Sequence, residues 1–132
     1  RKRMELYFRI ANYRQASRLV SNGTDTQLLA SYVARGCRRT RIVADVETPD
    51  DTVEIARVCA VEGCEAYVDR LLEHADSHTI LIVEDIADNP TARRIWQRLL
   101  DSPKVSVSYD LYWAGVAFFD TERFKTCYIV NF

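Results

Sequence analysis

Apolar residues along this chain fall into short continuous runs separated by segments with a helical pattern. The run Thr79-Ile80-Leu81-Ile82-Val83 has no alternating polar positions, which is typical of a strand covered by helices on both faces. After a predicted strand at 18–22, the apolar residues 28, 29, 32 and 33 fall on one face of a helix. We therefore expect alternating strands and helices, with residues 79–83 at the centre of the sheet.

Glycine, proline and capping residues set the expected limits of the other elements. Gly36 is expected to end the helix that contains residues 28–33, in a left-handed conformation. Thr48 and Pro49 fit the N-cap and first position of a helix that ends at Gly63. The other predicted elements before Pro103 are a helix over 4–13, strands over 41–47 and 65–68, and a helix over 88–100.

The pattern changes after Pro103, where three strand-like segments follow one another without a helix: 105–111, 115–119 and 127–132. Parallel strands followed by such an ending predict an α/β fold. We expect a Rossmann-like three-layer sandwich with a mostly parallel sheet and an antiparallel C-terminal end. Residues 1–132 are expected to form a single domain, because 48 % hydrophobic residues suffice for one core.

The cysteines and the apolar runs limit where the protein is expected to work. The four cysteines contain no C-x-x-C pair, which fits reduced thiols better than a disulfide framework. No apolar run approaches the roughly 20 residues that a membrane span needs, and the basic first residues are not followed by the apolar stretch of a signal peptide. We therefore expect a cytoplasmic protein that does not bind membranes.

The net charge of −1 conceals an asymmetry along the chain. Residues 1–41 carry ten Lys or Arg and two acids, a balance of +8, so the remainder carries −9. The basic part fits nucleic acid, an acidic partner or the acidic part of its own chain. We do not expect nucleic acid, because aromatic residues are not interleaved with these basic residues. Aromatic residues crowd the last quarter instead, and we expect a homodimer or a protein partner there.

Four segments resemble one family, the class I S-adenosylmethionine-dependent methyltransferases of the small-molecule O-methyltransferase-like branch. Residues 19–27 with the helix 28–34 are similar to the first motif, and Val43-Ala44-Asp45-Val46-Glu47 is similar to the second strand. Residues 80–86 resemble the fifth strand, and residues 105–111 with 115–119 resemble the closing antiparallel hairpin. The resemblance covers most of the chain, but the chain is shorter than the family.

This resemblance implies S-adenosylmethionine as the cofactor and transferase chemistry. The implied cofactor-binding residues are Ser21, Gly23, Asp25, Glu47, Asp69 and Asp85. Glycine at position 23 lets the backbone approach a ligand closely, because a Cβ would block it. A carboxylate at position 47 can accept hydrogen bonds from both ribose hydroxyls. No residue is assigned a catalytic role.

Departures from the family pattern argue against full activity. Ser21 replaces an acid at the end of the first strand, and Gln27 replaces the second glycine of the turn. The segment between Asp69 and Thr79 is too short for the family's fourth strand and helix, where an acid lies beside the reacting methyl group. We expect a degenerate, catalytically impaired methyltransferase-like domain that acts as a binding or interaction module. The alternative is an active small-molecule O-methyltransferase.

The missing strand leads to a geometric prediction. The strand that contains Leu19 and Val20 should be hydrogen-bonded directly to the strand that contains Leu81. No closed pocket should then lie between Gly23, Glu47 and Asp85, because a ligand there would lose one wall. An intervening strand, or an enclosed cavity lined by Gly23 and Glu47, would overturn the prediction of an impaired enzyme and favour the active methyltransferase.

Two groups of possible metal ligands have simpler interpretations. Glu84, Asp85 and Asp88 could hold a divalent cation through oxygen ligands, but acids between a strand and a helix are more often caps. His74 and His78 have a spacing that suits zinc on a helix, although the residues between them favour a loop. We expect no metal site.

Overall fold

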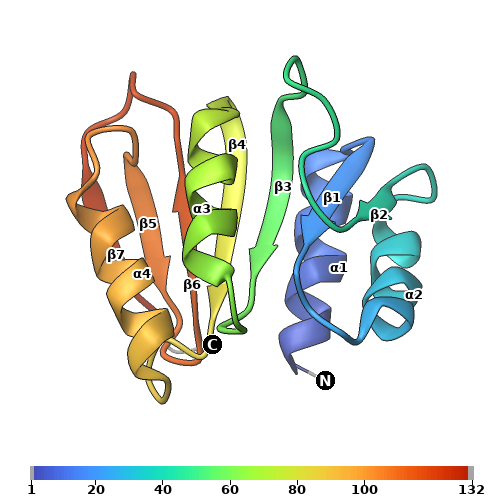
Figure 1. The fold of residues 1–132 in the computed structure, drawn as a ribbon, viewed down its shortest axis with the longest axis horizontal. Helices are drawn as coiled ribbons and strands as arrows, with labels where there is room; N and C mark the ends of the chain where they lie inside the picture. Colours follow the sequence, from blue (N-terminus) through green and yellow to red (C-terminus); the bar gives the residue numbers. More distant parts are fainter. Residues whose placement is uncertain (1, 131–132) are drawn as a thin grey trace.

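A mixed β-sheet runs through the middle of the protein, with helices on both faces (Figure 1). The structure, a computed structural model, describes residues 2–130. The helices are α1 (Lys2–Arg14), α2 (Thr26–Gly36), α3 (Cys64–Glu73) and α4 (Pro90–Asp101). The strands are β1 (Arg18–Ser21), β2 (Arg41–Val43), β3 (Val53–Val58), β4 (Ala75–Glu84), β5 (Val107–Asp110), β6 (Ala114–Phe118) and β7 (Thr126–Ile129).

The strand order of the sheet is β2-β1-β3-β4-β6-β5-β7. The first four of these strands are parallel, and β6 is antiparallel to both of its neighbours. The predicted α/β class, a Rossmann-like three-layer sandwich with an antiparallel C-terminal part, is confirmed. The last strand differs in one respect, because β7 is parallel to β5. The chain leaves β6, passes the start of β5 and returns along its far side.

The core has two layers, one on each face of the sheet. Leu81 and Val83 of β4 pack with α3 and α4, while Ile80 and Ile82 of the same strand pack with α1 and α2. All four side chains are buried. Residues 79–83 are therefore the central, doubly covered strand that the apolar run predicted.

The helix predicted to run from Thr48 to Gly63 is wrong, because Val53–Val58 forms strand β3. Ala56 of β3 pairs with Val20 on one side and with Leu81 on the other. The β-branched residues of this segment suit a strand buried on both faces. The turn before it is held by the Asp51 carboxylate, which accepts hydrogen bonds from the Glu47 and Thr48 amides.

Strand β3 also overturns the predicted direct pairing of β1 with β4. Both strands pair with β3, which lies between them. The sheet therefore contains a strand at the position where the short segment between Asp69 and Thr79 had predicted that one is missing. The short strand predicted over 65–68 is also wrong, since these residues belong to α3.

Two glycines have roles other than those predicted. Gly36 is the last residue of α2 and is not left-handed. A Cβ at Gly36 would lie 2.5 Å from the Phe8 carbonyl oxygen and 2.7 Å from the Asn12 nitrogen, so glycine lets α2 approach the backbone of α1. Gly63 is left-handed, with φ of 81°, but it precedes α3 as its N-cap and ends no helix.

Candidate functional site

The carboxyl ends of β1, β3 and β4 lie side by side, at the edge where open parallel sheets bind ligands. Asn22 follows β1 and holds this edge together. Its side-chain amide donates to the Cys59 carbonyl at 2.9 Å and accepts from the Cys59 amide at 2.7 Å. The glycine turn after β1 is thereby fixed against the end of β3.

A buried arginine occupies the space beside this turn. The Arg57 side chain is 3 % exposed, and its Nε donates to Glu84 Oε2 at 2.7 Å. Its Nη1 donates to Asp25 Oδ1 at 2.6 Å. One guanidinium thus connects β3, the end of β4 and the residue that precedes α2.

Charge and burial act in opposite directions on this cluster. Burial alone would lower the pKa of Arg57, but its hydrogen bonds to Asp25 and Glu84 outweigh burial and hold this pKa above its ordinary value. The hydrogen bond from Arg57 likewise lowers the pKa of Asp25. The arginine therefore remains a cation, and Asp25 an anion, throughout the neutral range.

Gly23 is in contact with this arginine. A Cβ at Gly23 would lie 2.6 Å from Arg57 Nη1 and 3.1 Å from Cys59 Sγ. A side chain at this position would collide with the guanidinium. The close approach that the sequence assigned to a ligand is thus made by a side chain of the same chain.

Helix α1 covers the cluster from the face of the sheet. The Tyr7 hydroxyl donates to Glu84 Oε2 at 2.7 Å, and the Tyr7 ring lies 5.4 Å from the Arg57 guanidinium. Arg3 donates to Glu84 at 3.3 Å and to Asp85 at 2.9 Å. Burial, then the charge of Glu84, raises the pKa of Tyr7, so its hydroxyl stays protonated. Glu84, 2 % exposed, accepts hydrogen bonds from four side chains, those of Arg3, Tyr7, Arg57 and Cys59.

Four of the six predicted cofactor-binding residues come together at this edge. Ser21 is buried, and its Oγ accepts a hydrogen bond from the Gly23 amide at 3.2 Å. Asp25 is bound by Arg57, and Asp85 is bound by Arg3. Each of these predicted polar residues therefore has a partner within the protein.

The other two predicted residues lie elsewhere. Glu47 forms ion pairs with Arg18 and Arg41, at 3.3 and 3.6 Å, and these arginines are the first residues of β1 and β2. Glu47 therefore does not lie at the edge that holds Gly23, because β2 ends at Val43 and the chain turns back along the sheet. Asp69 of α3 pairs on the surface with Arg98 of α4.

Sequence reasoning missed the residues that fill the site: Arg3, Tyr7 and Arg57. One signal was present, because Arg57 is the only charged residue in the apolar stretch 55–58. A charge in a buried strand requires a charged partner. The chain gives no local sign of that partner, which lies 27 residues further along.

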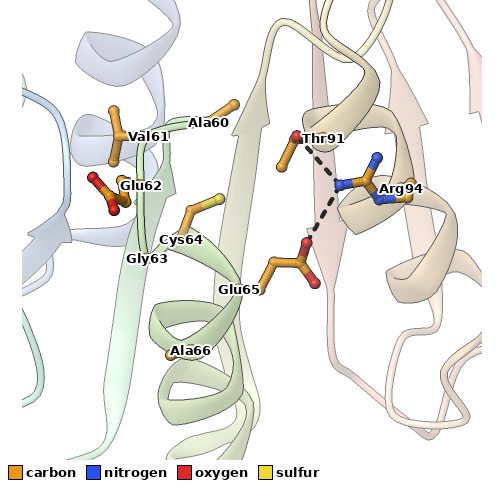
Figure 2. A pocket seen from close by; sticks show the side chains of 9 residues that line it. All are labelled: Ala60, Val61, Glu62, Gly63, Cys64, Glu65, Ala66, Thr91 and Arg94. Atoms are coloured by element: carbon orange, nitrogen blue, oxygen red, sulfur yellow. Dashed lines mark hydrogen bonds and ion pairs between the residues drawn. The ribbon is translucent and has the colours of Figure 1, made fainter.

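A hollow of about 420 Å³ lies away from the Arg57 cluster, where α3 and α4 begin (Figure 2). Arg94 reaches across it and contacts Glu65 at 3.5 Å and Thr91 at 3.3 Å. The Arg94 and Glu65 side chains are 65 % and 59 % exposed, so the hollow is open to solvent. None of the predicted cofactor-binding residues lines it.

Two of the residues considered as possible metal ligands are engaged in other contacts. Glu84 is bound to Arg57, and the His74 ring nitrogen lies 2.8 Å from the Asp51 carbonyl oxygen. Within residues 2–130, no cluster of three or more His, Cys, Asp or Glu is arranged to hold an ion. Among the helices described, none is both long and apolar enough to cross a bilayer.

Comparison of the chain with protein-family models, curated proteins and solved structures finds no match.

Proposed function

We propose that this chain is a methyltransferase-like binding module without methyl-transfer activity. The observation that carries this proposal is the position of Arg57, whose guanidinium fills the space beside Gly23. A sulfonium cofactor would need the same space and the same close approach to the glycine turn. S-adenosylmethionine does not fit beside Gly23 while Arg57 is there.

The electrostatics of the edge support the same proposal. The acids that could attract a cationic ligand, Asp25 and Glu84, are already paired with Arg57. A ligand would have to break two short charge-assisted hydrogen bonds and leave a buried arginine without partners, which is costly. The site is therefore satisfied without a ligand.

The residue after β3 supports a loss of catalysis. β3 lies between β1 and β4, as the fourth strand of the resembled family does, and that family places an acid there beside the reacting methyl group. Here the first residue after β3 is Cys59, and no acid follows before Glu62. Burial, and then the charge of Glu84, raises the pKa of Cys59 to about 12, so its thiol is a poor base or nucleophile at neutral pH.

The alternative, an active small-molecule O-methyltransferase, has one observation in its favour. The strand whose absence was expected is present, since β3 separates β1 from β4. The argument for an impaired enzyme from a missing strand therefore fails, and the proposal depends on Arg57 instead. For this alternative, Arg57 would have to leave Asp25 and Glu84 when the cofactor binds.

Calorimetric titration distinguishes the two functions. We expect no heat of binding with S-adenosylmethionine or S-adenosylhomocysteine up to millimolar concentration, in protein shown by circular dichroism to be folded. Asp85→Asn tests whether any binding takes place at this edge, because Asp85 lies there but does not take part in the Arg57 ion pairs. Micromolar binding to the wild type that weakens in Asp85→Asn would overturn the proposal and support the enzyme.

A further inference from the structure

The C-terminal edge of the sheet exposes a concentration of apolar side chains. Eight large apolar side chains are exposed in residues 2–130, and four of them lie within seven residues. Phe124 is 93 % exposed, Ile129 86 %, Tyr128 49 % and Val130 36 %. Exposed apolar side chains concentrated along one edge in this way are typical of an interaction site.

These residues belong to, or directly flank, an edge strand. Among the strands of residues 2–130, β7 pairs only with β5, and the amides of Thr126 and Val130 donate to the carbonyls of Ser106 and Asp110. Because a strand alternates, the amides of Cys127 and Ile129 point to the free edge. An unpaired edge is a template for another strand, and natural edges are usually blunted by charge or proline. Residues 126–130 contain neither.

An aromatic row leads from this edge into the sheet. The Tyr128 ring stacks on Tyr109 of β5 with centroids 5.3 Å apart, and Tyr109 meets Phe118 of β6 edge to face at 5.9 Å. Figure 1 shows α1 and α2 at the other end of the sheet, beside β1 and β2. These two helices do not reach β7, so the aromatic row is only partly covered at that end.

We propose that β7 is a dimerisation edge, where two copies of this chain pair antiparallel across a two-fold axis and join their sheets. This interface is independent of the site around Arg57. It gives an interaction module a defined partner, a second copy of itself.

The charge distribution suits a second copy. The charge nearest to the strand is Lys125, and antiparallel pairing about a two-fold axis at Cys127 sets it opposite Ile129 of the second copy, away from the other Lys125. The Lys125 ammonium is also held back, because it donates to the Ser102 and Val105 carbonyls at 2.7 and 2.8 Å. Two copies therefore meet without like charges in contact.

The area also favours a partner with an equally apolar strand. Large side chains bury roughly 150 to 250 Å² each, so Phe124, Tyr128 and Ile129 offer on the order of 400 Å² per copy. Two copies, with Val130 and the strand backbones, reach about 1,000 Å², the lower limit for a specific interface. A polar strand as partner would leave the apolar contact well below that limit.

Light scattering from low-micromolar to submillimolar protein tests the dimer. We expect a mass twice the monomer's 15.2 kDa, and at least a tenfold weaker dimer for Ile129→Lys. Tyr13→Lys is the matched control, because Tyr13 is 76 % exposed on α1, and it should remain dimeric. A monomeric wild type, equal weakening by both substitutions, or growth into open-ended polymers would overturn the proposal.

Cross-linking tests the position of the contact. Cys127 is exposed, Cys37 and Cys64 are buried, and the raised pKa of Cys59 slows its reaction. A short bis-maleimide should therefore link two copies through Cys127, and Cys127→Ser should abolish the linked species. A dimer that is not linked through Cys127 would exclude pairing through β7. Unchanged circular dichroism of Ile129→Lys would show that its fold is intact.

Discussion

At the scale of single residues, the pair of Arg57 and Glu84 determines what the carboxyl edge of the sheet can do. Their side chains are 3 % and 2 % exposed, and their charged atoms lie 2.7 Å apart. Such a pair is close to neutral for stability as a whole, because desolvation offsets the attraction. Removal of one partner is costly, since the other charge remains buried. The intact ion pair therefore adds little to the free energy of unfolding, although the loss of either charge alone would lower it strongly.

Arg57→Leu tests this dependence. We expect it to lower the free energy of unfolding by about 3 to 5 kcal/mol, because Glu84 loses its buried partner and keeps only the partly exposed Arg3, at 3.3 Å, as a counter-charge. Arg57→Leu with Glu84→Gln should recover most of that loss, since glutamine is neutral and still accepts from Tyr7. Urea denaturation followed by circular dichroism measures both.

The control for these variants is the exposed pair of Arg98 and Asp69. Their side chains are 46 % and 57 % exposed, so Arg98→Ala should change the free energy of unfolding by at most about 1 kcal/mol. An Arg57→Leu variant as stable as Arg98→Ala would contradict the account of the buried pair.

At the scale of elements, local signals identified most strands and helices but misassigned two segments, 48–63 and 65–68. Asn89 caps α4 as expected, accepting hydrogen bonds from the amides of Thr91 and Ala92. Thr48-Pro49 gave the same signal but opens a turn. Residues 53–58 form a strand because they pair with both β1 and β4. These tertiary contacts outweigh the local helix signal. The same error misplaced the candidate site, since Arg57 was assigned to a helix.

Gly36→Ala tests the packing of α1 on α2. Alanine favours a helix over glycine by about 1 kcal/mol, but its Cβ would collide with backbone atoms of α1. We expect a net loss of stability of about 1 to 3 kcal/mol and a lower melting temperature in calorimetry. Ala34→Gly, at an exposed position of the same helix, measures the propensity term alone. A more stable Gly36→Ala would show that the helices separate without cost.

At the scale of the whole molecule, part of the charge asymmetry is neutralised within the fold. Three basic residues of the first third pair with acids of the remainder: Arg3 with Glu84 and Asp85, Arg18 with Glu47 and Asp51, and Arg41 with Glu47. The sequence left open whether the basic part faces a partner or its own chain. For these three arginines it is the chain itself, and the pair of Arg3 and Glu84 joins residues 81 positions apart.

The dependence of stability on pH follows from two of these acids. Hydrogen bonds from Arg57 lower the pKa of Asp25, and hydrogen bonds from Arg18 lower the pKa of Asp51 to about 2. A lowered pKa contributes stability above the unfolded value, and this stability is lost as the pH falls through the folded value. We expect the melting temperature to fall between about pH 4 and pH 2. Asp51→Asn should melt lower at neutral pH and show a smaller fall in acid; an unchanged slope would exclude Asp51 as a contributor.

The contact of α1 with the end of β4 has a consequence for the order of events during synthesis. Tyr7 and Glu84 are 77 residues apart, and a ribosome adds about 5 to 20 residues per second. Helix α1 can pack on α2 early. Glu84, whose carboxylate binds Arg3 and Tyr7, is synthesised roughly 4 to 15 s after Tyr7. During that interval the nascent chain presents an unfinished surface, and this contact forms only after β4 has been synthesised.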